Sequence, residues 1–237
     1  MRIDKYLVEN SYFESRNRAL EAIKGGKIRV DGRVVKPSVR VNLSSIIEIE
    51  DEKFYVSRAG RKIESFLKSH AIDLTDKRAL DIGSSTGGFA QILLEYGVKS
   101  INCVDVGSNQ LHISLRDSDK IYVNEETDIR EFQSDRSFEV ISCDVSFISI
   151  LNIIDDIDRL SEDGADIIIL YKPQFEVGRD VRRNSRGVVV DQDAIDRKRE
   201  RFEVEAKKLN WELIYQEESK VVGKSGNQEY LYHFIKH

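Results

Sequence analysis

Two polar residues follow neighbouring apolar runs and could perform acid–base chemistry: Asp144 comes after residues 138–143, and Lys172 after residues 166–171. Apolar runs of this length are typical of buried parallel strands, whose carboxyl ends face ligands. A lysine amine is normally protonated, with a pKa of about 10.4. Beside a second lysine and a cationic ligand its pKa should fall, and it could then take a proton from a hydroxyl group. The alternative interpretation is an Asp144–Lys172 ion pair that only ties two strands together.

A glycine-rich stretch, residues 81–89, lies between an apolar strand-like run and a segment with helical periodicity. Its glycines permit backbone angles that a side chain forbids and let a ligand approach the main chain. The spacing is neither that of the dinucleotide-binding loop nor that of the phosphate-binding P-loop. An acidic residue at the start of such a turn favours S-adenosylmethionine (SAM), although a tight strand–helix turn is the alternative. The predicted cofactor residues here are Asp81, Gly83, Ser84, Ser85, Thr86, Gly87, Gly88 and Phe89.

Further carboxylates fall at predicted strand ends. Asp105, followed by Val106, closes a strand over residues 100–106, where ribose hydroxyls of a nucleoside cofactor are usually held. Asp128 follows a strand over residues 121–123 and is predicted either to contact the adenine side of the cofactor or to cap a helix. Asp144 completes the predicted cofactor site.

Strands and helices alternate through this part of the chain, which predicts an α/β, doubly wound sheet. A long helix over residues 191–210 has a buried stripe of Ile195, Phe202, Ala206 and Leu209. Strands over residues 211–219 and 230–236 are predicted to form a closing hairpin, with Glu229 just before the second.

The first forty residues hold ten Lys/Arg against five Asp/Glu, within a chain whose net charge is −5. We predict a helix capped by Ser15 that stops at Gly25-Gly26, then two short strands joined by an Asp31-Gly32 turn. A basic segment on an acidic body indicates polyanion binding at one end, although chance clustering of charge is equally consistent with the composition. The predicted phosphate-binding residues are Arg2, Lys5, Arg16, Arg18, Lys24, Lys27, Arg58, Arg61, Arg179, Arg182 and Arg183.

Composition excludes several classes of protein. The 237 residues are 40% apolar and 33% charged, and they suffice for one sizeable α/β domain and a small companion. No run of about 18 apolar residues and no signal peptide is visible, so we expect a cytoplasmic protein. Cys103 and Cys143 lie in apolar runs and are predicted to be reduced core residues. Four scattered histidines predict no metal site.

Residues 1–50 resemble the S4 RNA-binding domain. The matching positions are Arg2, Asp4, Leu7, Ser15, Arg16, Ala19, Ile23, Gly26, Val30 and Gly32. The resemblance implies a small α+β domain that recognises folded RNA by its shape and backbone. A small helical cap on the larger domain is the alternative.

The remainder of the chain resembles the TlyA family of rRNA 2′-O-methyltransferases, which join an S4 domain to an FtsJ-like, Rossmann-like class I SAM-dependent methyltransferase domain with a mostly parallel seven-stranded sheet. Matching segments lie at residues 56–62, 79–90, 104–111, 143–149, 172–179, 186–191 and 226–230. The resemblance predicts an S4-like domain at residues 1–52, a linker at 53–56 and the methyltransferase domain at 57–237.

FtsJ-like enzymes carry a Lys-Asp-Lys-Glu set, which falls here on Lys62, Asp144, Lys172 and Glu229. The resemblance implies that Lys172 activates a ribose 2′-hydroxyl of cytidine for attack on the SAM methyl group. Asp144 would steer the sulfonium and that lysine, while the other two residues fix the nucleotide. No metal is implied.

The expected partner is ribosomal RNA or a ribosomal subunit. The chain is short at both ends relative to members that modify both subunits, which favours 23S over 16S rRNA. Two alternatives belong to other classes: a non-catalytic RNA-binding or ribosome-assembly factor, and a membrane-active haemolysin.

Overall fold

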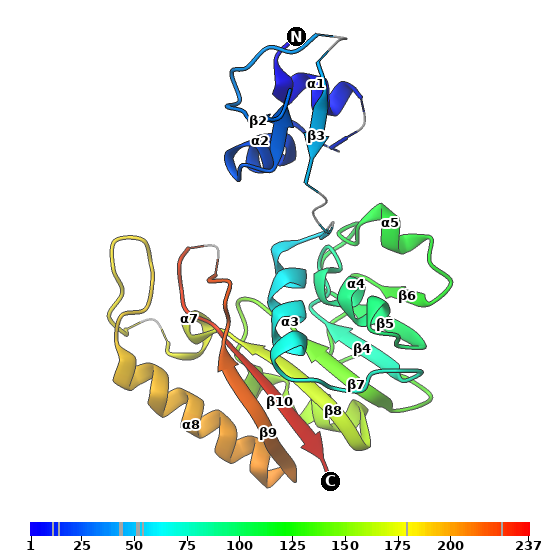
Figure 1. Cartoon of the computed structure of the whole chain (residues 1–237). Coiled ribbons are helices and arrows are strands. Elements are labelled where there is room, and N and C mark those ends of the chain that lie inside the picture. Colours follow the sequence, from blue (N-terminus) through cyan, green and yellow to red (C-terminus); the bar gives the residue numbers. More distant parts are fainter. Residues whose placement is uncertain are drawn as a thin grey trace. The chain divides into compact units, whose positions relative to one another are not determined.

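A computed structural model describes residues 1–10, 12–13, 15–42, 45–50, 53, 55–178, 180–223 and 225–237. The chain divides into two compact units, Met1–Phe54 and Tyr55–His237, and each is described by itself (Figure 1). Phe54, within the segment 53–56 predicted as a linker, lies outside the described residues, as do the last two residues of the predicted S4-like domain.

The N-terminal unit packs two helices, α1 (Ile3–Glu9) and α2 (Arg16–Lys24), against a three-stranded antiparallel sheet. Ser15 caps α2 as predicted, because its side chain accepts a hydrogen bond from the backbone N–H of Arg18. The predicted Asp31-Gly32 turn is also confirmed, with φ of 51° and 76° at its two residues. The sheet order is β2 (Arg33–Val34), β1 (Ile28–Val30), β3 (Ile47–Ile49), and β3 was not predicted.

The larger unit is built on a seven-stranded sheet in the order β6-β5-β4-β7-β8-β10-β9. Every neighbouring pair from β6 to β8 is parallel, and β10 runs antiparallel to both β8 and β9. The predicted α/β fold and its mostly parallel sheet are therefore confirmed. The strands are β4 (Arg78–Ile82), β5 (Ser100–Val104), β6 (Ile121–Asn124), β7 (Phe138–Cys143), β8 (Ser161–Tyr171), β9 (Trp211–Glu218) and β10 (Tyr230–Lys236).

Helices cover both faces of this sheet (Figure 1). Alternate residues of β8 divide between two cores: Ile167 and Ile169 pack on one side, Ile168 and Leu170 on the other. This is why β8 reads as an unbroken apolar run. The second side packs against α3 (Arg58–Ser69), α4 (Gly88–Glu95) and α5 (Ile113–Arg116); the first packs against η1 (Ile150–Asn152), α6 (Ile154–Leu160) and α8 (Gln192–Lys208).

The short helix α7 (Pro173–Glu176) follows β8 directly. Cys103 and Cys143 are free thiols buried in the two cores, as predicted, and burial raises the pKa of the Cys143 thiol to about 12. No helix in the described ranges is long and apolar enough to cross a membrane.

Candidate active site

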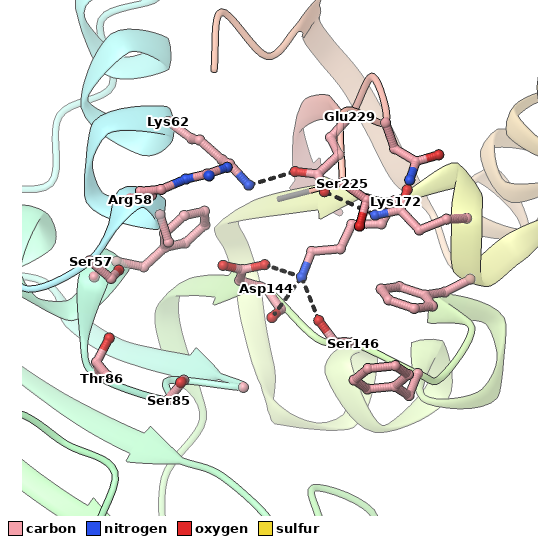
Figure 2. A pocket seen from close by; sticks show the side chains of 18 of the residues that line it. Ser57, Arg58, Lys62, Ser85, Thr86, Asp144, Ser146, Lys172, Ser225 and Glu229 are labelled. Carbon is pink, nitrogen blue, oxygen red and sulfur yellow. Dashed lines mark hydrogen bonds and ion pairs between the residues drawn. The ribbon is translucent and has the colours of Figure 1, made fainter. Parts of the chain in front are cut away.

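Four side chains from four separate elements meet at one cavity beside the carboxyl ends of the parallel strands (Figure 2). Lys62 comes from α3, Asp144 follows β7, Lys172 follows β8, and Glu229 precedes β10. The cavity has a volume of about 790 Å³, which is ample for a nucleoside-sized ligand. Residues that are up to 167 positions apart in the sequence are thus brought together by the sheet topology.

Helix α3 reaches the cavity because its backbone crosses that of α4 closely at Gly60 and Gly88. A Cβ at Gly60 would lie 3.0 Å from the carbonyl oxygen of Gly88, and a Cβ at Gly88 would lie 2.1 Å from the Ser57 Oγ. This close crossing places Lys62, which is 7% exposed, over the glycine loop. Ser57 lies at the N-cap of α3, although its side chain makes no capping hydrogen bond.

Lys62 and Glu229 form a buried ion pair. The Lys62 Nζ lies 2.5 Å from Glu229 Oε2, and the other carboxylate oxygen accepts a hydrogen bond of 3.0 Å from the Gln174 side chain. Glu229 is only 3% exposed, so both of its oxygens are held in place away from bulk water. Buried charges need such partners, because an unpaired one costs several kcal/mol.

Three oxygen atoms surround the amine of Lys172 (Figure 2). Its Nζ lies 2.5 Å from Asp144 Oδ1, 2.9 Å from Ser146 Oγ and 3.4 Å from the Asp144 carbonyl oxygen. An ammonium group has three N–H donors, so this set matches its protonated form. The ion pair that was the alternative interpretation of these residues is therefore present, and it lies within the cavity wall.

Two carboxyl groups at the strand ends are perturbed by burial. Burial raises the pKa of Asp144 in spite of the Lys172 amine, and it raises the pKa of the fully buried Asp81 to about 7. Ser142 Oγ donates a 2.6 Å hydrogen bond to Asp81 Oδ1. The second oxygen, Oδ2, is buried and meets no well-oriented donor within the described part of the chain. Buried carboxyl groups with strongly perturbed pKa values cluster at binding and active sites.

The glycine loop forms one wall of the cavity. Most of the residues predicted to bind a cofactor line it: Asp81, Gly83, Ser84, Ser85, Thr86, Gly88, Phe89 and Asp144. Gly83 (φ 74°) and Gly87 (φ 90°) have backbone angles that favour glycine. A Cβ at Gly83 would lie 3.1 Å from the Asp144 carbonyl oxygen, so the loop sits directly against the β7 end.

Four of the predicted cofactor residues, Gly87, Asp105, Val106 and Asp128, are not among those that line the cavity. The Asp105 carboxylate accepts hydrogen bonds from the backbone N–H groups of Ser85 and Gly107, both at 2.8 Å, and so shapes the glycine loop. The Val106 side chain is largely exposed. Asp128 lies in a turn, where hydrogen bonds from Arg130 lower its pKa to about 2.

The loop after β5 depends on a carboxylate that the sequence did not single out for this role. Glu125 accepts backbone hydrogen bonds from Asn109, Gln110 and Leu111 and pairs with the Arg116 guanidinium. The Arg116 hydrogen bond, followed by these backbone N–H groups, lowers the pKa of Glu125 to about 2. Glu125 therefore anchors the segment beside the glycine loop.

In the larger unit, the basic residues predicted to bind RNA differ from one another in their contacts and exposure. Arg58 and Arg183 both line the cavity, but their guanidinium groups also donate to backbone carbonyls: Arg58 to Val222, and Arg183 to Gln174, Gly178 and Gly187. The Arg61 guanidinium lies 5.3 Å from the ring centre of Tyr55. Arg182 is exposed, and Arg179 lies outside the described residues. Arg186, left out of the predicted RNA-binding set, also lines the cavity.

In the N-terminal unit, Arg2 and Arg16 both bind the buried carboxylate of Asp4, at 3.0 and 2.8 Å. Burial alone would raise the pKa of Asp4, but these two guanidinium groups outweigh it and lower the pKa. Three residues of the S4-like signature thus form one ion cluster. Lys5 pairs with Glu9, Lys24 is exposed, and Arg18 and Lys27 are partly exposed. RNA contact by these residues stays a prediction.

Several cavity residues escaped the sequence analysis, although their segments had been singled out. Ser146 contacts Lys172, Gln174 contacts Glu229, and the rings of Phe147 and Phe175 lie side by side, 4.9 Å apart, in the cavity wall. Phe147 is 91% exposed and has a φ of 65°, which is unusual for a bulky residue. The exposure of the Phe147 side chain marks it as a candidate binding residue, and this exposure is visible only in the structure. No cluster of potential metal ligands occurs among the residues that the structure describes.

Comparison with known proteins agrees with this geometry. Residues 55–236 match the FtsJ-like methyltransferase family, and residues 1–47 match the S4 domain. A Campylobacter jejuni protein, 23S rRNA (cytidine-2′-O)-methyltransferase TlyA, is 43% identical over the full length of both chains. The chain belongs to the TlyA family of FtsJ-like methyltransferases.

Other relatives of this TlyA-family chain support the assignment. The Mycobacterium tuberculosis protein named 16S/23S rRNA (cytidine-2′-O)-methyltransferase TlyA is 34% identical, covering 97% of this chain and 88% of its own. The solved structure described as "Putative hemolysin from Streptococcus thermophilus" is 31% identical with a TM-score of 0.74, covering 100% of this chain and 88% of its own. The chain is thus an FtsJ-like methyltransferase with an S4 domain at its N-terminus.

Proposed function

We propose that this protein transfers the methyl group of SAM to the 2′-hydroxyl of a cytidine in ribosomal RNA, with 23S rRNA the favoured substrate. The observation that carries the proposal is the convergence of Lys62, Asp144, Lys172 and Glu229 on one cavity beside the glycine loop. The relatives named as rRNA cytidine-2′-O-methyltransferases support the same substrate. Ribosomal RNA as the substrate would place the protein in the cytoplasm.

The cavity suits SAM in several respects. The glycine loop leaves its backbone open to a ligand, and the carboxyl groups of Asp81 and Asp144 line the cavity, where a cationic sulfur would favour their charged forms. The poorly partnered oxygen of Asp81 is a buried acceptor of the kind that a bound ligand satisfies. SAM supplies a methyl group on a positively charged sulfur that departs as a neutral thioether.

In the proposed chemistry Lys172 accepts the proton of the 2′-hydroxyl as the oxygen forms its bond to the methyl carbon. The amine lies at the edge of the sheet, in the wall of the cavity that would hold both the hydroxyl group and SAM. After the proton arrives, Asp144, Ser146 and the Asp144 carbonyl oxygen supply the three acceptors that an ammonium needs. No metal takes part in this scheme.

Lys62 and Glu229 are proposed to fix the target nucleotide, because they form a buried ion pair that lines the same cavity as Asp144. The exposed ring of Phe147 and its neighbour Phe175 offer apolar faces of the kind on which bases stack. Orientation of the hydroxyl and the methyl group accounts for much of the rate enhancement that such a site can provide.

The proposal is tested by incubating the purified protein with methyl-labelled SAM and either isolated large or isolated small ribosomal subunits. We expect label on one cytidine ribose of large-subunit RNA, detected because a 2′-O-methyl group blocks alkaline cleavage at that position. Label on a base, or no transfer to either subunit by protein that binds SAM, would overturn the proposal.

A further inference from the structure

One buried carboxyl group lies close to the active site but has no part in the chemistry proposed above. Glu176, the last residue of α7, is 9% exposed. Its Oε2 accepts a 2.5 Å hydrogen bond from the Ser149 hydroxyl, and its Oε1 accepts one of 2.9 Å from the backbone N–H of Ile150. Burial raises the pKa of Glu176, and these hydrogen bonds act against that increase. Burying a carboxyl group is costly, so its place calls for a function.

Both donors belong to the segment that carries the partners of Lys172. This segment runs from Asp144 at the end of β7 to Ile150 at the start of η1, and it includes Ser146. Lys172 and Glu176 in turn stand at the two ends of one short segment, residues 172–176. The two segments are therefore joined twice: by the Lys172 amine on the cavity side and by the Glu176 carboxyl group on the other.

A simple helix cap would not require this arrangement. The Ser149 hydroxyl already caps η1, because it accepts a hydrogen bond from the backbone N–H of Leu151. η1 has only three residues, and an exposed carboxylate or water could satisfy its free N–H groups. The two hydrogen bonds of Glu176 instead form a buried tie between the Asp144–Ile150 segment and residues 172–176. This tie fixes the separation between the two segments, and the contacts of Lys172 depend on that separation.

We propose that Glu176 is a positioning residue that holds the Asp144–Ile150 segment at the distance from which Asp144 and Ser146 orient the Lys172 amine. This inference rests on the function proposed for Lys172. A misplacement of about 1 Å in such a group can reduce the rate on the order of 100-fold, so the tie acts on catalysis without touching the substrate.

The test compares four variants: Glu176→Gln, Glu176→Ala, Ser149→Ala and Ser149→Thr, with the exposed Glu200→Ala as a matched control. We expect kcat to fall about tenfold or more in Glu176→Ala. The fall should be smaller in Glu176→Gln and Ser149→Ala, which each keep one hydrogen bond, and absent in Ser149→Thr, which keeps the hydroxyl. KM for SAM and for RNA should stay within about twofold.

A second readout needs no activity: the rate at which an amine reagent labels Lys172 relative to Lys62 in the free protein. Loss of the tie should raise the labelling of Lys172 and leave that of Lys62 unchanged. If Glu176→Gln lowers thermal stability but leaves kcat and the labelling ratio unchanged, Glu176 is only a structural residue and the inference is wrong. Failure of the wild type to methylate RNA would instead contradict the proposed function, while the labelling ratio would still test Glu176.

Discussion

At the residue scale, the surroundings of Lys172 decide what this site can do. An amine in contact with a carboxylate, a hydroxyl and a carbonyl oxygen is well satisfied while it is charged. When it is neutral it has one donor fewer and a lone pair to offer. Ser146 can adapt to that change because a hydroxyl both accepts and donates hydrogen bonds, whereas the Asp144 carboxylate only accepts them.

Replacing Ser146 by alanine should therefore slow methyl transfer. The Lys172 amine loses one of the three oxygen atoms that orient it, so we expect kcat at neutral pH to fall by less than about tenfold. Ser146→Thr keeps the hydroxyl and should reproduce the wild-type kcat. An unchanged kcat in Ser146→Ala would contradict this role for Ser146.

The raised pKa of Asp81 predicts how the stability of the protein depends on pH. Its folded-state pKa, raised by burial to about 7, exceeds the unfolded value of 3.8, so between these values the folded protein holds a proton that the unfolded chain has lost. Its stabilising contribution is complete below about pH 3.8 and is lost as the pH rises to about 7, at up to about 1.4 kcal/mol per pH unit. Urea unfolding of the free protein and of Asp81→Asn should show a steeper decline in the wild type, because the raised pKa values of Asp144 and Glu176 remain in the variant. Parallel stability curves from pH 4 to 7 would contradict the assignment.

The sequence predicted those site residues that can be recognised by their type and by their place at the end of a strand. Asp144 and Lys172 were placed at the sheet edge by the apolar runs beside them, and the family resemblance supplied Lys62 and Glu229. Ser146, Gln174 and Glu176 were missed because each acts through a contact with a residue from another element. Arg183 was predicted to face RNA, but nothing in its sequence indicated that it also donates to three backbone carbonyls.

At the element scale, the crossing of α3 and α4 explains how a lysine from outside the strand–helix alternation enters the site. The two helices meet at Gly60 and Gly88, so their backbones are close enough to bring the first turn of α3 against the glycine loop. Helical periodicity after the glycine loop predicted α4, but the sequence could not predict that α3 touches it, because no pattern within a helix identifies its neighbour.

Gly88→Ala should therefore destabilise the protein by about 1–3 kcal/mol and weaken SAM binding. The new methyl group would stand 2.1 Å from the Ser57 hydroxyl oxygen and 2.9 Å from the backbone nitrogen of Gly60. Adding Ser57→Ala removes the first clash only, so the double variant should recover part of the stability. Calorimetric Tm and SAM titration measure both effects; a single variant as stable as the wild type would show that α3 can move aside.

At the scale of the whole molecule, charge separates the two units. The N-terminal unit carries the basic excess, while the methyltransferase unit is acidic overall. The sequence predicted the helix capped by Ser15 and a hairpin there, but not β3, whose three residues are too short a run to be recognised. It also could not show that Arg2 and Arg16 serve Asp4, because the pairing depends on how α1 and α2 pack.

Removing the N-terminal unit should weaken RNA binding more than cofactor binding. A chain that begins at Tyr55 keeps the cavity and its four charged residues, so we expect its affinity for SAM to stay within a few-fold of that of the full chain. Its affinity for ribosomal RNA should fall, and the slope of log affinity against log salt should become shallower, because fewer phosphate contacts release fewer counterions. An unchanged salt slope would show that the unit does not hold RNA.

The central claim is that Lys172 removes the proton from the hydroxyl that is methylated, and single-turnover methyl transfer by Lys172→Ala tests it most directly. With large subunits and saturating SAM, we predict a rate at least about 100-fold below that of the wild type, with SAM affinity preserved and the exposed Lys207→Ala unaffected. A Lys172→Ala protein that binds SAM and transfers the methyl group at the wild-type rate would contradict the account.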